Sequence, residues 1–204
     1  MPRDQTLIVI QSHREGYALH PKAVKIMARK TGIPGQHAND RHGKTSLYSQ
    51  QLREKQKVRR IYGLLEKQFA RLMKEAERKD GLSGENLLKL LEMRLDNVVY
   101  RAGFATSRRQ ARQLVTHGQF KLNGRRVDIP SIRVKVGDEL VVREKAQKNG
   151  YFSHLEEISR DTMTQPVAWI KSDPKKQTIK IVALPTRENA EPDINEQLIV
   201  EYYS

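Results

Sequence analysis

Three consecutive residues, Gly43, Lys44 and Thr45, match the end of the loop that holds nucleotide phosphates in many ATPases and GTPases. In that loop, backbone N–H groups surround the phosphates, the lysine reaches the outer phosphates and the hydroxyl binds Mg²⁺. The pattern also requires a glycine five residues before Gly43, where Ala38 stands, and a strand that leads into the loop. Because both are missing, the sequence argues against nucleotide hydrolysis.

A second candidate for catalysis is Asp96, in the stretch Arg94-Leu-Asp96. The same three residues carry the catalytic aspartate of pseudouridine synthases, which would make the chain an RNA-modifying enzyme. In those enzymes the stretch belongs to a large separate catalytic domain, and no downstream segment of this chain is long enough to form one. We therefore interpret Asp96 as the partner in a salt bridge on the N-terminal side of a helix. Pseudouridine formation on RNA would contradict this interpretation.

The other reactive side chains form no recognisable catalytic or metal-binding pattern. The six histidines are scattered, and the absence of cysteine excludes disulfides and thiolate metal sites. His37 and His42 share one loop without a nearby pair of carboxylates, and the Gly-x-Ser-x-Gly motif of serine hydrolases is absent. We therefore expect no metal, no cofactor and no enzymatic activity.

Positive charge is the strongest functional signal in the sequence. The 204 residues include 38 lysines and arginines against 24 acidic residues, a net charge of +14. Residues 44–126 hold 20 basic and 8 acidic residues, whereas residues 185–204 hold 1 basic and 5 acidic residues. A chain this basic commonly binds a polyanion, and nucleic acid is the first candidate. The acidic end should avoid phosphate and pack against protein.

Two clusters of basic and amide side chains could form a nucleic-acid surface. The first cluster, at residues 53–60, consists of Arg53, Lys55, Lys57, Arg59 and Arg60. The second cluster, at residues 108–126, consists of Arg108, Arg109, Arg112, Lys121, Asn123, Arg125 and Arg126. Arginine can bond a phosphate through two parallel N–H donors, which suits it to this role. Either cluster could be a merely solvated surface, but we expect the two to share one RNA-binding surface.

Membrane and export signals are missing from the sequence. No apolar run approaches the roughly 20 residues that cross a bilayer. The four consecutive apolar residues 7–10 are also too few for a signal peptide. We therefore expect a protein that is not exported and has no contact with a membrane.

Helices are expected to position both clusters. Apolar residues recur every three or four positions over residues 46–79, which predicts one long helix that carries the first cluster near its start. A second helix is expected over residues 83–103 with Ser83 as its cap, and a third over residues 107–118 with the arginines of the second cluster on one exposed side. Residues 1–45 show little periodicity, so we expect an extended N-terminal arm.

After the third helix the pattern changes from helix to strand. Asn123-Gly124 between two apolar stretches is a strong signal for a tight hairpin. Residues 151–161 should form a short helix, and Asp193 with Glu196 resembles the capping box of a last helix, although the same residues would also suit a strand. Further strands are expected at residues 132–136, 139–143, 167–171 and 178–184, and the last two should form a second hairpin across Asp173-Pro174.

Seven stretches of the chain, in this order, point to one family. They are Gly35–His37, Gln51–Gly63, Gly84–Leu88, Arg94–Arg101, Ala111–Val115, Val142–Lys145 and Asp193–Glu201. Together they resemble the bacterial-type ribosomal protein S-four family from about Arg14 to the end of the chain. The resemblance implies an α+β fold, in which a helical domain carries an inserted RNA-binding module of helices and a small antiparallel sheet. The implied boundaries are 1–45 for the extended arm, 46–95 plus 185–204 for the helical domain, and 96–184 for the module.

The resemblance also implies a function. Members of this family bind a junction of helices in the five-prime domain of small-subunit rRNA and start assembly there. Their loop before the long helix lines the channel through which messenger RNA enters, beside ribosomal proteins S-three and S-five, and their acidic end meets S-five, where decoding accuracy is influenced. The expected location is the ribosome, in the cytoplasm or in an organelle. A free RNA-binding regulator is the remaining alternative, and it would not sediment with small subunits.

Site residues follow from the resemblance, position by position. Contact with rRNA is expected at Gln36, His37, Tyr48, Arg53, Lys55, Lys57, Arg59, Arg60, Arg108, Arg109, Arg112, Gln113, Lys121, Asn123 and Arg125. Arg41 and Lys44 are expected in the messenger RNA channel, and Glu196, Glu201 and Tyr202 at the protein partner. Replacing the three arginines of the third helix by alanine is expected to weaken rRNA binding and to leave thermal unfolding nearly unchanged.

Overall fold

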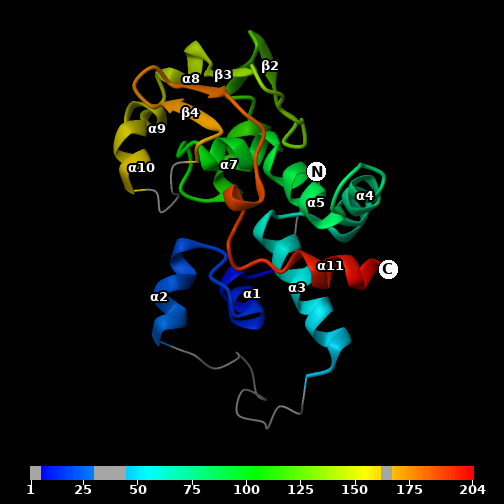
Figure 1. The fold of residues 1–204 in the computed structure, drawn as a ribbon. Coiled ribbons are helices and arrows are strands. Elements are labelled where there is room, and N and C mark those ends of the chain that lie inside the picture. Colours follow the sequence, from blue (N-terminus) through cyan, green and yellow to red (C-terminus); the bar gives the residue numbers. More distant parts are fainter. Residues whose placement is uncertain (1–5, 30–44, 162–166) are drawn as a thin grey trace. The chain divides into compact units, whose positions relative to one another are not determined.

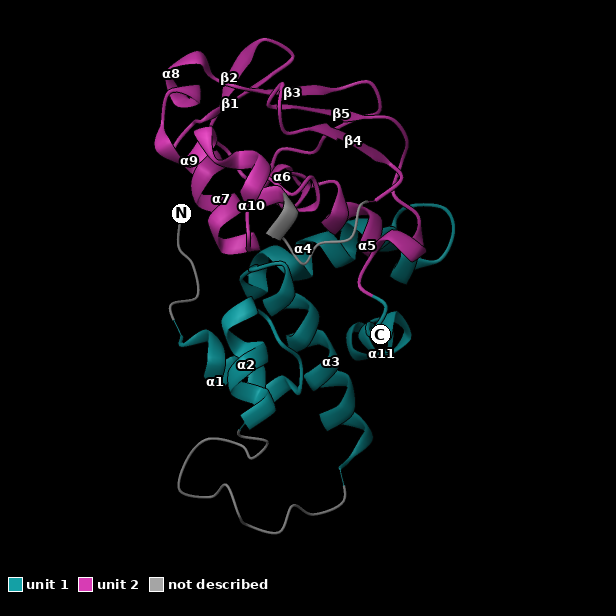
Figure 2. Ribbon diagram, turned by 90° about the vertical axis from the view of Figure 1, so that its left-hand side faces the viewer, with its two compact units in different colours: residues 1–87, 192–204 teal, residues 88–191 magenta. Residues whose placement is uncertain are grey.

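A computed structural model of the chain describes residues 6–29, 45–161 and 167–204. The chain forms two compact units (Figure 2), which we call the helical unit, Met1–Leu87 with Pro192–Ser204, and the sheet unit, Leu88–Glu191. The polypeptide therefore leaves the helical unit once, builds the sheet unit, and returns to the helical unit for its last residues.

Helices alone make up the described part of the helical unit (Figure 1). They are α1 (Ile8–Glu15), α2 (Pro21–Arg29), α3 (Leu47–Ile61), α4 (Glu66–Glu77), the first half of α5 (Ser83–Glu92) and α11 (Glu196–Tyr203). α11 packs against α3, so the end of the chain covers a helix that begins about 150 residues earlier. The apolar faces of α3 and α4 are buried through Val58, Ile61, Phe69, Met73 and Ala76.

The first two helices differ from the extended arm that the sequence predicted. Gly16 ends α1 in the left-handed conformation, with φ 63°. The N–H of Gly16 donates to the carbonyl of His13, and the N–H of Tyr17 donates to the carbonyl of Ser12. Pro21 begins α2, where its fixed φ suits the first turn and its missing N–H removes no helical hydrogen bond. These stop and start signals act locally. The apolar periodicity of the sequence therefore does not predict α1 and α2.

The helix predicted over residues 46–79 is interrupted and forms α3 and α4. Gly63 adopts φ 64° between them, a conformation that glycine reaches without steric cost. The N–H of Gly63 donates to the carbonyl of Arg60 at 3.1 Å, and that of Leu64 donates to the carbonyl of Arg59 at 2.9 Å. These bonds end α3, although the apolar period continues across the break.

The sheet unit combines five short strands with six helices among its described residues. The strands are β1 (Phe120–Leu122), β2 (Arg125–Val127), β3 (Glu139–Val142), β4 (Ile170–Asp173) and β5 (Thr178–Ile181). All neighbouring strands are antiparallel, in the order β2-β1-β3-β5-β4. The helices are the end of α5, α6 (Leu95–Arg101), α7 (Arg108–Thr116), α8 (Glu144–Gln147), α9 (Gly150–Ser153) and α10 (Leu155–Asp161), with a 3₁₀ turn at Arg187–Asn189. The expected α+β fold is confirmed.

One predicted helix and one predicted strand are both wrong, for the same reason. Residues 83–103 form two helices, α5 and α6, and residues 132–136 form no strand beyond a single bridge between Arg133 and Arg94. The N–H of Leu95 donates to the carbonyl of Ile132 at 2.8 Å, and the N–H of Val134 donates to the carbonyl of Met93 at 3.0 Å. Residues 132–136, which were expected in a sheet, therefore form hydrogen bonds with the backbone at the break between α5 and α6.

Both predicted hairpins are present. Asn123 and Gly124 have φ values of 49° and 81°, as the tight turn between β1 and β2 requires. β4 and β5 form the second hairpin. The segment expected as one helix over residues 151–161 is split into α9 and α10. The last element is a helix and not a strand, and its cap is Asn195, which accepts a hydrogen bond from the N–H of Gln197, rather than Asp193.

Candidate nucleic-acid interface

α7 begins as the sequence predicted and presents one exposed arginine. Ser107 caps the helix, because its hydroxyl accepts from the N–H of Gln110 at 3.3 Å. Ala111 and Val115 are fully buried, which fixes the opposite side of the helix toward solvent. Arg109 and Gln113, four residues apart, are exposed there. This side of α7 can offer a guanidinium and an amide to a polyanion.

The other two arginines of α7 are not on that exposed side, so this part of the prediction was wrong. Arg108 donates to Glu191 at 2.7 Å and to Asn97 at 2.9 Å, and its guanidinium lies 4.5 Å from the ring centroid of Tyr100. Arg112 pairs with Asp96 at 3.3 Å. Both arginine side chains are only 16% exposed. Their acidic partners come from distant parts of the chain, and no local pattern reveals such pairs.

These arginines belong to a buried network of charged side chains. The carboxylate of Glu92 is fully buried and accepts from Arg101 at 2.9 and 3.0 Å and from Asn97 at 2.8 Å. Arg101 also lies 3.4 Å from Glu191, which in turn pairs with Arg108. Since Arg108 donates to Asn97, the five side chains close into a ring, which we call the glutamate ring.

Asp96 lies beside the glutamate ring and behaves as the sequence predicted. It stands in the first turn of α6 and pairs with Arg94 through two hydrogen bonds of 3.1 and 2.8 Å. Arg112 supplies a second cation, and the N–H of Asn97 donates to the same carboxylate at 3.0 Å. A carboxylate with this many donors serves as a structural anchor.

The hairpin residues of the second cluster divide between two faces of the sheet. Lys121 is paired with Arg126 and with Val141 in the register, so these three share the face opposite to the buried Phe120 and Leu140. Lys121 also pairs with Glu144 at 3.2 Å. Arg125 is opposite Leu122, whose side chain packs toward the core that α7 covers, and Arg125 is exposed.

Asn123 is built into the turn that it forms. Its side-chain amide donates to Asp138 at 2.8 Å, and its side-chain oxygen accepts from the N–H of Glu139 at 2.9 Å. These bonds join the β1–β2 turn to the start of β3. The side chain therefore has a structural role, beyond the RNA contact that the resemblance implied.

The first cluster is a set of ion pairs that holds the helical unit together. Arg53 pairs with Glu15 of α1 at 3.1 Å, and Arg60 pairs with the same carboxylate, whose side chain is fully buried. Lys57 pairs with Glu54 at 2.8 Å and donates to the carbonyl of Asp193 at 2.6 Å. The cations of α3 thus tie together α1 and the segment before α11.

Lys55 is the clearest correction within this cluster. Only 3% of the residue is exposed, because α11 covers it. Its ammonium group pairs with Glu66 at 2.9 Å and lies 4.3 Å from the ring centroid of Tyr202. A lysine between a carboxylate and an aromatic ring stabilises the helical unit, and in this structure it does not face solvent.

The acidic end of the chain packs against this protein, as its charge led us to expect. Glu201 accepts from Gln51 at 3.1 Å, and the ring of Tyr202 lies 5.8 Å from that of Tyr48, which is 62% exposed. The hydroxyl of Tyr203 donates to Glu66 at 2.8 Å. One side of α11 is therefore used to cover α3.

The pKa values of two carboxyl groups in the helical unit are shifted in opposite directions. Burial raises the pKa of Glu15, although the charges of Arg53 and Arg60 oppose this effect. Burial also acts to raise the pKa of Glu66, but the hydrogen bonds from Lys55 and Tyr203 outweigh it and lower the pKa. The two groups should therefore give opposite contributions to the pH dependence of stability.

We expect this difference to appear in thermal unfolding of Glu66→Gln and Glu15→Gln. Relative to Glu66→Gln, the wild-type chain should lose stability as the pH falls below 4.5, because folding favours the charged carboxylate of Glu66. Relative to Glu15→Gln, it should lose stability as the pH rises above 4.5, because the folded chain holds the proton of Glu15 more tightly than the unfolded chain does. Melting curves from about pH 3 to pH 7 measure both differences. If the two stability differences changed with pH in the same direction, the pKa shifts of Glu15 and Glu66 would be contradicted.

Four predicted site residues, Gln36, His37, Arg41 and Lys44, lie outside the described residues. Sequence reasoning also missed three residues that shape the interface, which are Glu15, Glu92 and Glu191. Glu15 pairs with Arg53 and Arg60, and Glu191 pairs with Arg108. Glu92 pairs with Arg101 in the same glutamate ring as Arg108. Their spacing along the chain carries no periodic signal, so only the folded structure identifies them.

Comparison with known proteins connects this geometry to a family. A family model described as "Ribosomal protein S4/S9 N-terminal domain" matches residues 11–92, and one described as "S4 domain" matches residues 93–140. The chain is 50% identical over 200 residues to "Small ribosomal subunit protein uS4" of Clostridioides difficile strain 630, with 95% of each chain covered. The chain belongs to the uS4 family.

Other members of the uS4 family match over similar lengths. The identity is 45% over all 204 residues to the uS4 protein of Chlorobium limicola, and 48% over 194 residues to that of Roseiflexus castenholzii. As a uS4 family member, the chain is an RNA-binding structural protein of the small ribosomal subunit, and the family is not enzymatic. The predicted family, the ribosomal location and the absence of enzymatic activity are confirmed. No helix within the described residues is long and apolar enough to span a bilayer.

Proposed function

We propose that this uS4 family member binds a junction of helices in the five-prime domain of small-subunit rRNA and nucleates assembly there. The observation that carries the proposal is the exposed side of α7, with Arg109 and Gln113, inside the segment that matches an S4 domain. Double-stranded RNA hides its base edges in a deep, narrow groove, so cations and amides must read the geometry of its backbone. By holding one junction geometry, the protein would favour that RNA conformer through mass action.

The residues expected to contact rRNA fall into four groups. Side chains at the surface are offered by Tyr48, Arg109, Gln113 and Arg125. Those held by acids or amides, which must exchange these partners for phosphate, are Arg53, Lys57, Arg59, Arg60, Arg108, Arg112 and Lys121. Lys55 and Asn123 have structural roles, and Gln36 and His37 belong to the proposal on the resemblance alone.

We further propose the protein contacts and the domain division of the family for this chain. Glu196, Glu201 and Tyr202 would meet ribosomal protein S-five and influence decoding accuracy, and Arg41 and Lys44 would line the messenger RNA channel beside S-three. The acidic composition of residues 185–204 supports a protein partner at α11. The proposed domains are 1–45, 46–95 plus 185–204, and 96–184.

Binding of the full chain to isolated five-prime-domain rRNA tests the proposed function. Arg109→Ala combined with Arg125→Ala should weaken binding by roughly tenfold for each arginine near 0.1 M salt, because each loses about one phosphate contact. The temperature of unfolding should hardly change, since both side chains are exposed.

The matched control is Lys171→Ala combined with Lys175→Ala. It removes the same charge from exposed positions of the same unit, on and after β4. We expect it to bind nearly as well as the wild-type chain. An equal loss in both double variants would mean that total charge, and not the α7 side of the sheet unit, determines binding.

A further inference from the structure

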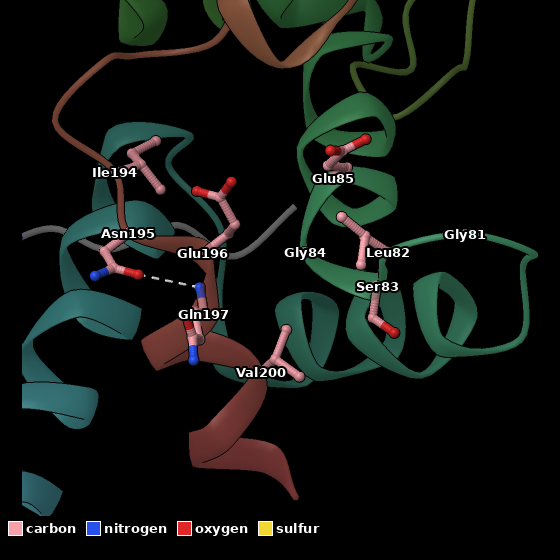
Figure 3. A pocket seen from close by; sticks show the side chains of 10 residues that line it. All are labelled: Gly81, Leu82, Ser83, Gly84, Glu85, Ile194, Asn195, Glu196, Gln197 and Val200. Atoms are coloured by element: carbon pink, nitrogen blue, oxygen red, sulfur yellow. Dashed lines mark hydrogen bonds between the residues drawn. The ribbon is translucent and has the colours of Figure 1, made fainter.

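A surface that binds phosphate without any exchange of partners needs cations that no carboxylate holds. The groove between the starts of α5 and α11 has the opposite charge, because Glu85 and Glu196 are the charged residues that line it (Figure 3). Cations gather instead on a face of the sheet that, apart from Lys121, the proposed function does not use.

The strand register places six side chains on this face, which we call the outer face: Lys121, Arg126, Val141, Thr178, Lys180 and Lys171. Phe120 and Leu140, at neighbouring positions of β1 and β3, point the other way into the core, which Ala111 and Val115 of α7 join. Figure 2 shows α7 on that side of the sheet. The outer face and the exposed side of α7 are therefore directed away from each other.

Arg126 of β2 lies against Gly118, two residues after the end of α7. A Cβ atom at position 118 would lie 2.7 Å from Nε and 2.9 Å from Nη2 of Arg126, so a larger residue would displace this guanidinium group. Gly118 also has φ 64°, a conformation that glycine reaches without steric cost. The glycine therefore makes room for the arginine.

Arg143 approaches the same glycine from β3. It follows Val141 by two residues, so its side chain begins on the outer face. Its Nη1 donates to the carbonyl of Gly118 at 3.0 Å. Because both guanidinium groups lie around one residue, Nε of Arg126 and Nη1 of Arg143 are at most about 9 Å apart.

Neither of these two guanidinium groups has a carboxylate partner within residues 6–29, 45–161 and 167–204. In this they differ from Arg108 of α7, which Glu191 holds. The acid next to Arg143 in the chain is Glu144, which pairs with Lys121 at 3.2 Å. The Glu144 side chain is 86% exposed, so solvent screens its charge.

We infer that Arg126 and Arg143, with Lys121 beside them, form a second phosphate site that holds rRNA backbone on the outer face. Their separation lets the two guanidinium groups hold one phosphate between them through charge-assisted hydrogen bonds. The thickness of the sheet and of α7 separates this site from Arg109, so one straight strand cannot reach both. The second site therefore takes a separate stretch of rRNA. The inference rests on the proposed function and adds a contact to it.

Binding of the full chain to isolated five-prime-domain rRNA tests the site by affinity. Arg126→Ala combined with Arg143→Ala should weaken binding by roughly tenfold for each arginine near 0.1 M salt. Arg126→Ala alone, at an exposed position, keeps the test decisive if loss of the Arg143 hydrogen bond impairs folding.

The matched control is Lys171→Ala combined with Lys180→Ala. It removes the same charge from two exposed positions of the outer face, on β4 and β5. We expect it to bind nearly as well as the wild-type chain. An equal loss in both double variants would overturn the assignment to the two arginines.

Cleavage of rRNA from an iron chelate on one introduced cysteine tests where the RNA lies. The chain has no cysteine of its own, so the chelate attaches at a single place. Val141→Cys carries the chelate on the outer face, and Gln113→Cys carries it on the exposed side of α7. Both chains are bound to rRNA at saturating concentration, with and without Arg126→Ala.

We expect positions 141 and 113 to cleave different stretches of rRNA. Arg126→Ala should lower cleavage from position 141 by roughly threefold or more and leave cleavage from position 113 unchanged. The inference would be overturned by a bound chain that does not cleave from position 141, by cleavage of the same nucleotides from both positions, or by cleavage from position 141 that ignores Arg126→Ala. A wild-type chain that does not bind this rRNA would refute the proposed function and the inference with it.

Discussion

Raising the salt concentration from 50 to 200 mM should weaken the binding of this protein to five-prime-domain rRNA by roughly 10³–10⁵, on the scale measured for duplex DNA. This loss is expected for a protein that neutralises about six to ten phosphates, because each contact releases a condensed counterion. Binding constants measured across this range give the slope directly. A flat response would contradict an electrostatic interface.

The salt dependence of the binding constant also reports whether the paired arginines exchange their carboxylate partners for phosphate. Arg53 and Arg60 are held by Glu15, and Arg108 is held by Glu191. If they kept these carboxylates in the complex, the surface cations among the described residues expected to contact rRNA would be Arg109, Lys121 and Arg125, and their contribution to the loss would be only about 10². A loss of about 10³ or more is expected when phosphate replaces carboxylate at the paired arginines.

Replacing Glu92 by glutamine should destabilise the sheet unit by about 3–5 kcal/mol. The Glu92 carboxylate is fully buried and accepts two hydrogen bonds from Arg101, so its loss leaves a guanidinium in a poorly solvated place without its main counter-charge. For a unit of about 100 residues, this corresponds to a fall of on the order of 10 °C or more in the unfolding temperature. Calorimetry of the full chain measures the shift.

Two controls separate the glutamate ring from charge in general. Arg109→Ala, on the exposed side of α7, should change stability by no more than about 0.5 kcal/mol. Replacing both Glu92 and Arg101 by leucine should destabilise less than Glu92→Gln alone, because no buried charge remains unpaired. If Glu92→Gln unfolded like the wild-type chain, the ring would not stabilise the unit.

Arg108→Ala should be destabilising too, because it removes a member of the same ring. This replaces the expectation from the sequence that replacing the arginines of α7 leaves thermal unfolding nearly unchanged.

Features that depend on neighbouring residues could be predicted from the sequence. The Asn123-Gly124 turn and the Ser107 cap of α7 require particular side chains at particular positions, and both are present. The family could be predicted as well, because its long motifs are spread over most of the chain. The exposure of Arg109 follows from the same local logic, since Ala111 and Val115 fix the buried side of its helix.

Features that depend on distant residues could not be predicted. The break between α5 and α6 is satisfied by the backbone of Ile132 and Val134, about 40 residues away. The burial of Lys55 depends on Tyr202, at the far end of the chain. An apolar period gives the buried side of a helix, but it does not show which carboxylate will meet an arginine. For this reason the basic clusters could be located in the sequence, but the division between buried and exposed cations could not.

The discontinuous helical unit sets an order for synthesis of the chain. α3 leaves the ribosome that makes it long before α11 does, because the whole sheet unit, Leu88–Glu191, is translated between them. At about 5–20 residues per second, these roughly 100 residues take about 5–20 s. During this time Lys55 has Glu66 but lacks the aromatic ring of Tyr202. A nascent chain that stops before its last helix therefore leaves Lys55 uncovered, and only completed translation buries this lysine under α11.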